Sequence, residues 1–348
     1  MNREYWKNKN VLITGVCGTV GSELLKQLST AGCGYIIGVD NNETELFFLS
    51  QEYAENPHIE LFLCDVRDRS AIMKIMNCID IVLHSAALKH VILCERSPRD
   101  AVATNIDGMM NVIDAAESNK VERLIFTSSD KAVNPTNVMG TTKLMGERLI
   151  TAANAHRHHE TDTVFASTRF GNVLGSRGSV IPIFARQIAK GGPITLTDES
   201  MTRFIMTLKE AVSLVLESAT MARGGEVFVT KMPVIKIADL ASVMIELLAG
   251  KYGHKPEDIK VNIIGAKPGE KMYEELLSDE EVRRTIELDR FFSVTPAFKG
   301  IYHNIQYDYD AIKESKVDNP YNSSNEIALT KEQLKNYIVE NELLKEVI

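Results

Sequence analysis

Residues 10–28 decide the fold and read Asn-Val-Leu-Ile-Thr-Gly-Val-Cys-Gly-Thr-Val-Gly-Ser-Glu-Leu-Leu-Lys-Gln-Leu. The apolar run 10–14 predicts a buried strand, and the pattern of residues 22–28 predicts a helix. Three glycines, Gly15, Gly18 and Gly21, separate them in a G-x-x-G-x-x-G spacing. Glycine lets the backbone approach a pyrophosphate closely, and a helix N-terminus favours its negative charge. The stretch therefore predicts a strand, a phosphate-binding turn and a helix.

A carboxylate closes the next predicted strand. Residues 35–39 form an apolar run, and Asp40 follows Gly21 by 19 positions. An acidic side chain at that place accepts hydrogen bonds from the adenine-ribose hydroxyls and repels a 2′-phosphate, which favours NAD over NADP. The first candidate cofactor residues are Gly15, Gly18, Thr19, Val20, Gly21 and Asp40. The competing interpretation is a plain strand-to-helix turn followed by an unrelated aspartate.

Alternating strands and helices extend this beginning into a larger sheet. Further strands are predicted at 59–64, 80–84, 123–127 and 163–168, with helices near 43–54, 68–77, 98–118 and 138–157. Such alternation is typical of an α/β fold with a doubly wound parallel sheet of the Rossmann type. Asp65, Val66, Ala86 and Ala87 follow the third and fourth strands. They join the candidate cofactor residues because ligands of such sheets bind at the strand ends.

The regular alternation of predicted strands and helices ends at about residue 170, where short segments separated by glycine and proline begin. We expect a Rossmann domain over 1–170, with later segments returning to it, and a smaller substrate-binding domain with a C-terminal extension over 171–348. Helices are expected at 208–221 and 236–249. Thr330 and Gln333 form a capping-box pattern that predicts a terminal helix.

Composition narrows the class of protein. The 348 residues are 44% hydrophobic and 25% charged, with a net charge of -8 and no basic stripe, so nucleic acid is not an expected partner. Five cysteines without a C-x-x-C pair indicate reduced thiols. The polar start and the lack of a long apolar run predict a cytoplasmic chain without membrane insertion. His156, His158 and His159 lack supporting ligands, so no metal site is expected.

Reactive side chains gather where the strand near 123–127 ends. Ser128, Ser129, Asp130 and Lys131 follow it, and Met139 and Lys143 stand four positions apart on one face of a predicted helix. A carboxylate, two lysines and hydroxyls therefore converge on one small volume. The competing interpretations are an exposed Asp-Lys turn and a solvated helix lysine.

Longer motifs carry a family resemblance. Ala86-Ala-Leu-Lys-His-Val91, Ser128-Ser-Asp-Lys-Ala-Val-Asn-Pro-Thr-Asn137, Arg169-Phe-Gly-Asn-Val-Leu-Gly-Ser-Arg-Gly-Ser-Val-Ile-Pro182, Met201-Thr-Arg-Phe204 and Pro268-Gly-Glu-Lys271 resemble the UDP-N-acetylglucosamine 4,6-dehydratases of the extended short-chain dehydrogenase/reductase family. The resemblance covers residues 8–280 and implies surface-glycan biosynthesis. Its chemistry is oxidation at sugar C4, loss of water across C5 and C6, and return of the hydride to C6.

The resemblance also implies roles for residues. Lys131 would be the C5 base, Asp130 the acid for the C6 hydroxyl and Lys143 a ligand of the nicotinamide ribose. Ser128 or Ser129 would bond the sugar hydroxyl or merely cap the loop. Lys89 and Asn105 would complete the cofactor site. The UDP-sugar would contact residues spread along the chain, namely Lys89, His90, Asn172, Arg177, Ser179, Val180, Thr195, Arg203, Lys267 and Glu270.

Two positions depart from the family pattern. The usual Tyr-x-x-x-Lys is Met139-x-x-x-Lys143 here, as in a membrane-anchored subset that retains configuration at C5, so we expect retention. Lys267 replaces a common arginine. Two other functions stay open, a UDP-sugar 4-epimerase and a catalytically silent NAD-binding regulatory protein. Apolar faces on 98–118 and 138–157 suggest a homo-oligomer, although burial against the sheet explains part of that pattern.

Overall fold

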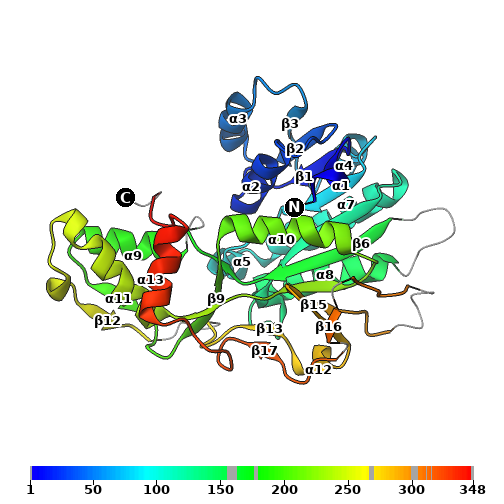
Figure 1. Ribbon diagram of the computed structural model, residues 1–348. Helices are drawn as coiled ribbons and strands as arrows, with labels where there is room; N and C mark the ends of the chain where they lie inside the picture. The colour runs from blue at the N-terminus through cyan, green and yellow to red at the C-terminus, as the bar shows by residue number, and fades with distance from the viewer. Residues whose placement is uncertain are drawn as a thin grey trace. The chain divides into compact units, whose positions relative to one another are not determined.

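The chain folds into two compact units (Figure 1). The computed structural model describes residues 2–154, 163–175, 179–265, 270–298, 305–310, 312–314 and 316–345. Unit 1 comprises Met1–Phe170, Val212–Thr230 and Ser278–Pro320, and unit 2 comprises Gly171–Ala211, Lys231–Leu277 and Tyr321–Ile348. The chain thus leaves unit 1 after Phe170 and returns to it twice.

Unit 1 is built on a sheet whose larger part is parallel. Its seven parallel strands are β1 (Val11–Thr14), β2 (Ile36–Asp40), β3 (Ile59–Leu63), β4 (Ile81–His84), β5 (Arg123–Ser129), β6 (Val164–Phe170) and β10 (Val227–Thr230). They lie in the order β3-β2-β1-β4-β5-β6-β10. The chain order reverses at β1, where sheets of this kind bind their ligands. The predicted doubly wound α/β fold is confirmed.

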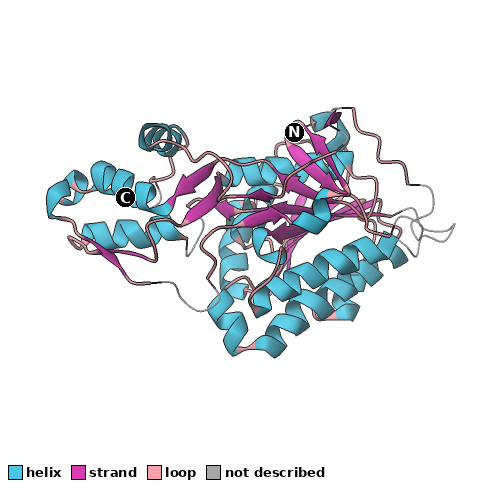
Figure 2. Cartoon of the chain, turned by 90° about the horizontal axis from the view of Figure 1, so that it is seen from below, coloured by secondary structure: helices cyan, strands magenta, loops and turns pink. Residues whose placement is uncertain are grey.

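Helices cover the sheet of unit 1 (Figure 2). They are α1 (Arg3–Trp6), α2 (Thr19–Leu28), α3 (Glu43–Glu52), α4 (Arg69–Ile75), α5 (Val91–Arg96), α6 (Pro98–Val102), α7 (Gly108–Ser118), α8 (Val138–Ala153) and α12 (Asp279–Val282). Apolar residues of α4, α7 and α8 form one core with alternate residues of β1, β4 and β5, among them Leu12, Val82 and Leu124. Residues 155–157 of the predicted helix 138–157 lie outside the described residues.

The predicted helix 98–118 is interrupted. A π-helical turn, Ala103–Asp107, separates α6 from α7. The side chain of Asn105 in this turn is buried and bonds the backbone of Leu88 through both its oxygen and its nitrogen, at 2.8 and 3.0 Å. The widened turn therefore gives the loop after β4 a fixed partner.

An antiparallel group of strands extends the sheet beyond β10. The order continues as β10, β15 (Phe291–Val294), β14 (Thr285–Leu288) and β16 (Ile312–Glu314). Each of these strands pairs antiparallel with its neighbour. The last segment of unit 1, Ser278–Pro320, thus supplies the edge of the sheet that ends in β16.

Unit 2 has its own core around three helices. These are α9 (Val180–Ala189), α11 (Ile237–Leu248) and α13 (Lys331–Glu340), whose apolar faces meet in one cluster. Its strands are β7 (Asn172–Val173), β8 (Ile194–Leu196), β9 (Thr202–Met206), β11 (Val234–Lys236), β12 (Val261–Ile263), β13 (Glu275–Leu277) and β17 (Tyr321–Asn322). Thr330 and Gln333 form the predicted capping box of α13. Helix α10 (Leu208–Met221) contains the residue at which the chain passes into unit 1.

Length and polarity of the helices bear on the membrane. Among the residues that the structure describes, none of the helices is both long enough and apolar enough to span a bilayer.

Two glycines of the β1–α2 turn have no room for a side chain. Gly15 has a φ of +72°, and a Cβ on it would lie 2.7 Å from the Cα of Ala86. A Cβ on Gly21 would lie 2.1 Å from the carbonyl oxygen of Gly15. The atoms that these Cβ atoms would meet belong to the backbone and cannot turn aside as a flexible side chain could. Only glycine at both positions therefore allows the first turn of α2 to pack against β1 and the loop after β4.

We therefore predict that Gly21→Ala lowers the free energy of unfolding by about 1–3 kcal/mol, the usual range for overpacking. The added methyl group must push the Gly15 carbonyl and with it the whole turn. Gly250→Ala is the matched control, since a Cβ there meets nothing within 4 Å. Urea denaturation of the two variants beside the wild type measures both effects, and equal midpoints for all three proteins would contradict the packing argument.

Candidate active site

The glycine-rich turn presents the start of a helix to a ligand. Gly18 is the N-cap of α2, and Thr19 and Val20 are its first residues. The N–H groups of the first turn of a helix have no intrahelical acceptors, and they favour an anion. A pyrophosphate fits this cradle because the glycines leave the backbone bare.

Asp40 lies at the end of β2 and is bonded to the glycine-rich turn. Its Oδ2 accepts from the backbone N–H of Cys17 at 3.0 Å, and its Oδ1 accepts from that of Asn42 at 3.0 Å. Each carboxylate oxygen keeps a lone pair for a further donor. The carboxylate is thus held beside the turn and retains acceptor capacity for a ribose hydroxyl.

The loops after β3 and β4 place the remaining candidate cofactor residues. Hydrogen bonds from Arg67 lower the pKa of Asp65 to about 2, so this carboxylate is charged, and Asn41 donates to it as well. Val66 is buried against Gly108. The backbone N–H of Ala86 donates to the hydroxyl of Thr14 at 3.3 Å, which joins the loop carrying Ala87 to the end of β1. Small residues at this place leave the backbone accessible.

Asn105 positions this loop from inside the protein. Besides its bonds to Leu88, its amide donates to the hydroxyl of Thr142 on α8 at 2.9 Å. The oxygen and nitrogen of the Asn105 amide are thus both bonded to the protein. One of their partners, Leu88, immediately precedes Lys89. Lys89 and His90 are exposed, and His90 is the N-cap of α5.

The end of β5 carries a tight cluster of polar side chains. Ser129 donates its hydroxyl proton to Oδ1 of Asp130 at 2.6 Å, and Nζ of Lys131 lies 3.0 Å from Oδ2 of the same carboxylate. Asp130 is only 4% exposed, whereas one third of the Lys131 side chain reaches solvent. The carboxylate is therefore held from two sides, and the lysine is accessible to a substrate.

Helix α8 is packed directly against this cluster. A Cβ on Gly140 would lie 2.3 Å from the carbonyl oxygen of Lys131, so glycine is what allows the approach. Met139, one residue earlier, is buried in an apolar cluster with Cys94 and Ala101, next to Val91 and Val138. Its thioether has no proton to exchange. The side chain that replaces the usual tyrosine therefore packs and does not titrate.

Lys143 is buried one turn further along α8. Its Nζ donates to the carbonyl oxygen of Thr127 at 3.0 Å and lies 4.7 Å above the ring centre of Phe126. Burial lowers the pKa of Lys143 to about 8, and Glu147 acts in the opposite direction. Burial and the Lys143 charge lower the pKa of His84 to about 3, so this imidazole is neutral. Lys143 thus loses its charge at mildly alkaline pH.

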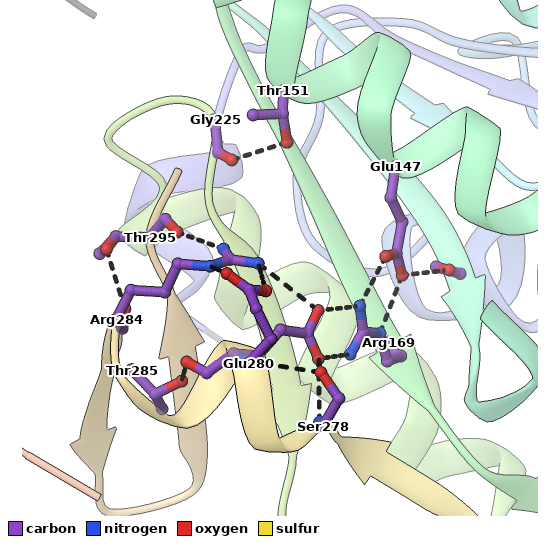
Figure 3. A network of polar contacts seen from close by, with 11 residues as sticks. Glu147, Thr151, Arg169, Gly225, Ser278, Glu280, Arg284, Thr285 and Thr295 are labelled. Carbon is purple, nitrogen blue, oxygen red and sulfur yellow. Dashed lines mark hydrogen bonds and ion pairs between the residues drawn. The ribbon is translucent and has the colours of Figure 1, made fainter. Parts of the chain in front are cut away.

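Sequence reasoning missed three buried residues that support the site. Glu147 accepts the hydroxyl proton of Ser128 at 2.6 Å, and Arg169 bridges Glu147 and Glu281 (Figure 3). The signal for Glu147 was its place four residues after Lys143, on the same helix face. Glu281 stands 112 positions from Arg169, so only the fold reveals the pair.

The candidate substrate residues of unit 2 are largely bonded to other residues of the same unit. The guanidinium of Arg203 donates to the backbone carbonyls of Thr202, Lys271 and Met272 and contacts the carboxylate of Glu274 at 3.2 Å. It therefore braces the segment around residue 271, and a diphosphate would have to compete for its donors. Glu274 also accepts from the side chain of Asn172 at 2.7 Å.

The other candidates lie near helix α9 or outside the described chain. Thr195 pairs with Gln187 through two hydrogen bonds. Ser179 is the N-cap of α9, and Val180 is its first residue. The hydroxyl of Thr197 lies 3.4 Å from Glu270. Lys267, Arg177 and the three histidines at 156, 158 and 159 lie outside the described residues.

Solved structures share this fold. The structure of Pen from Bacillus thuringiensis is 42% identical with a TM-score of 0.89, covering 98% of this chain and 100% of that one. The dTDP-glucose 4,6-dehydratase DesIV from Streptomyces venezuelae, solved with NAD bound, is 19% identical with a TM-score of 0.64 over 76% of this chain and 86% of its own.

Sequence comparisons identify the family. The family model described as polysaccharide biosynthesis protein matches residues 11–296. The uncharacterized membrane protein MJ1061 of Methanocaldococcus jannaschii is 46% identical over 97% of both chains. A UDP-N-acetylglucosamine 4,6-dehydratase (inverting) of Campylobacter jejuni is 37% identical over 89% of both. A UDP-glucose 4-epimerase of Rickettsia canadensis is 35% identical over 95% of this chain and 96% of its own. The chain therefore belongs to the polysaccharide biosynthesis protein family, which supports sugar-nucleotide dehydratase or epimerase activity.

Proposed function

We propose that the chain is an NAD-dependent 4,6-dehydratase of UDP-N-acetylglucosamine that forms a UDP-4-keto-6-deoxy-N-acetylhexosamine for surface glycans. The observation that carries the proposal is the Asp130–Lys131 pair at the end of β5, with Ser129 bonded to it. Removal of water needs a base and an acid at neighbouring carbons. A 4-epimerase needs a proton acceptor for the C4 hydroxyl but no base at C5 and no acid at C6, since its reaction involves no elimination.

NAD is the cofactor that the glycine-rich turn and Asp40 support. Bound NAD would supply a reversible hydride acceptor, which oxidation of the sugar at C4 requires. The Asp40 carboxylate would accept hydrogen bonds from the adenine-ribose hydroxyls and would repel a phosphate at the 2′ position. We therefore expect a smaller dissociation constant for NAD than for NADP, and equal or tighter binding of NADP would contradict this assignment.

Lys131 and Asp130 fit the elimination if the substrate separates them. In the structure the two groups form an ion pair, in which the lysine is protonated and cannot act as a base. A sugar placed between them takes the carboxylate away from the ammonium and excludes water, which favours release of the Lys131 proton to solvent, while Asp130 enters the reaction as a carboxylate. Lys131 then removes the C5 proton, and Asp130 protonates the departing C6 hydroxyl.

Ser129 and Asp130 also offer a route for the proton of the C4 hydroxyl. Met139 cannot accept it, and Ser129 already donates to Asp130. The C4 hydroxyl passes its proton to the Ser129 oxygen while Ser129 passes its own to Asp130. The carboxyl group thus formed supplies the proton that leaves with the C6 hydroxyl as water. Asp130 thus accepts a proton during oxidation at C4 and gives one up during loss of water. No tyrosine is needed to take the proton of the C4 hydroxyl.

Residues of unit 2 are the proposed contacts for the UDP moiety. Ser179 and Val180 start a ten-residue helix whose first N–H groups favour a phosphate. Polar groups are also offered by Asn172, Thr195, Arg203 and Glu270. The C. jejuni and R. canadensis relatives described above are named as enzymes of UDP-sugars, which supports a UDP-sugar as the substrate. Unit 1 would be the NAD-binding domain and unit 2 mainly the substrate-binding domain.

Exposed apolar side chains suggest association of a cytoplasmic chain with copies of itself. Ile92 and Leu93 on α5, Met110 on α7 and Met145 on α8 are 40–59% exposed. We propose that these helices form a homo-oligomer interface. Light scattering of the wild type should give a multiple of 38.8 kDa. A monomer at micromolar concentration would contradict the interface.

The direct test of the function is incubation of the protein with UDP-N-acetylglucosamine and NAD, followed by mass spectrometry. The proposal predicts a product one water lighter than the substrate. Lys131→Ala should form none while its affinity for NAD stays that of the wild type. An isobaric product would favour the epimerase, and an unchanged substrate would favour a silent NAD-binding protein.

A second prediction tests the shared role of Asp130. Asp130→Asn should stall before NADH builds up, because the acceptor of the C4 hydroxyl proton is lost and oxidation is blocked. Absorbance of enzyme-bound NADH on mixing with substrate measures this. Accumulation of NADH in the variant would restrict Asp130 to the acid step and leave Ser129 or a water molecule as the base.

A third prediction concerns stereochemistry. Met139 marks the resemblance to relatives that retain configuration at C5, so the fresh product should be the D-xylo 4-keto sugar. The coupling constants of its ring protons by NMR distinguish it from the L-arabino product. The latter would place this chain with inverting enzymes such as that of C. jejuni.

A further inference from the structure

A buried ion-pair network around Arg169 (Figure 3) is joined to β5 by the hydrogen bond from Ser128 to Glu147. Arg169 at the end of β6 is 1% exposed and bonds two carboxylates in bidentate fashion. Its Nε and Nη2 lie 2.9 and 2.6 Å from Glu147 on α8, and its Nη1 and Nη2 lie 3.0 and 2.9 Å from Glu281 on α12. The network therefore joins three elements that are distant in sequence.

Each carboxylate of the network has a second task. Glu281 completes the capping box of α12 with Ser278, and although burial raises its pKa, Arg169 holds that pKa at about 2. Glu147 accepts the hydroxyl of Ser128, whose chain neighbour is Ser129. One guanidinium between two carboxylates leaves a net negative charge. Burying it is expensive unless a further cation lies close.

Two cations meet that requirement. Arg284 approaches Glu281 at 3.9 Å. Lys143 stands one helical turn before Glu147, on the same face of α8. It is 7% exposed and contacts the Thr127 carbonyl and the Phe126 ring, neither of which carries a charge. Glu147 is thus the carboxylate placed to balance Lys143.

We propose that Glu147, locked by Arg169, is a positioning residue that keeps Lys143 protonated for the cofactor. Arg169 prevents the carboxylate from turning away and sets how much negative charge it presents to α8. Ser128 ties the same carboxylate to the strand that carries Ser129 and Asp130. The inference rests on the proposed NAD site, but it does not depend on which sugar-nucleotide reaction follows.

The groups around Lys143 define how NAD affinity should respond to pH. His84 on β4 is neutral across the working range, and Phe126 and Thr127 on β5 do not titrate. The Glu147 carboxylate accepts two hydrogen bonds from Arg169 and one from Ser128. Lys143 is then the group near the site that changes charge as pH rises through about 8. Loss of its positive charge weakens attraction for the negatively charged dinucleotide, so NAD affinity should fall across that pH.

The test is the dissociation constant of NAD between pH 6.5 and 9.5, measured by calorimetry on the full chain without sugar nucleotide. The wild type should lose affinity with a midpoint near 8. Glu147→Gln should move the midpoint down by about one pH unit, since an opposite charge nearby favours the charged form. Arg169→Lys is the matched control, because it disturbs the network but keeps the charge. Its midpoint should move less than that of Glu147→Gln, because the Glu147 carboxylate is still present.

The outcomes separate an electrostatic role from a merely structural one. Equal midpoints in the wild type and Glu147→Gln would overturn the proposal, as would equal shifts in Glu147→Gln and Arg169→Lys. If Glu147→Gln does not fold, two other results would overturn the proposal. One is an NAD affinity of the wild type that does not change with pH, and the other is a pH midpoint that persists in Lys143→Gln. Because no sugar nucleotide is present, failure of the dehydratase proposal would appear only in the product assay.

Discussion

The arrangement of the candidate active site depends on one buried guanidinium. Arg169 holds α8 through Glu147 and the returning segment through Glu281, directly behind β5. Removing one partner of such a buried pair costs about 3–5 kcal/mol, because a charge is left without compensation. That penalty fixes the helix carrying Lys143 relative to the strand carrying Ser129 and Asp130. Two close approaches, at Gly21 and Gly140, complete the same framework with backbone against backbone.

Methionine at position 139 changes which group handles protons. Its side chain lies in an apolar cluster, and the neighbouring chemistry has to pass through groups that exchange protons. The route that we propose is the Ser129–Asp130 hydrogen bond at the end of β5, beside a lysine that solvent can reach. Lys143 then keeps a single task, its charge toward the cofactor, and Glu147 is placed to maintain it.

Short-range patterns predict much of this structure, and long-range pairing explains the rest. Apolar runs and glycine spacing predict the six strands from β1 to β6, and Thr330 with Gln333 predicts the last helix, because these signals are local. The antiparallel strands β14 to β16 are three or four residues long, too short for a clear alternation. The π-helical turn at Asn105 and the partners of Arg169 and Arg203 depend on residues far away in sequence. For that reason the sequence predicts Arg203 as a phosphate ligand, whereas in the fold its guanidinium donates to the backbone carbonyls of Lys271 and Met272.

The central claim is that the Asp130–Lys131 pair directs an oxidised sugar toward elimination. The most direct measurement follows the hydrogen on C4. UDP-N-acetylglucosamine with deuterium at C4 is converted by the wild-type protein, and the product is analysed by NMR and mass spectrometry. The account predicts a product that has lost one water and carries the deuterium in its C6 methyl group. Deuterium that returns to C4 in a product of unchanged mass would contradict it.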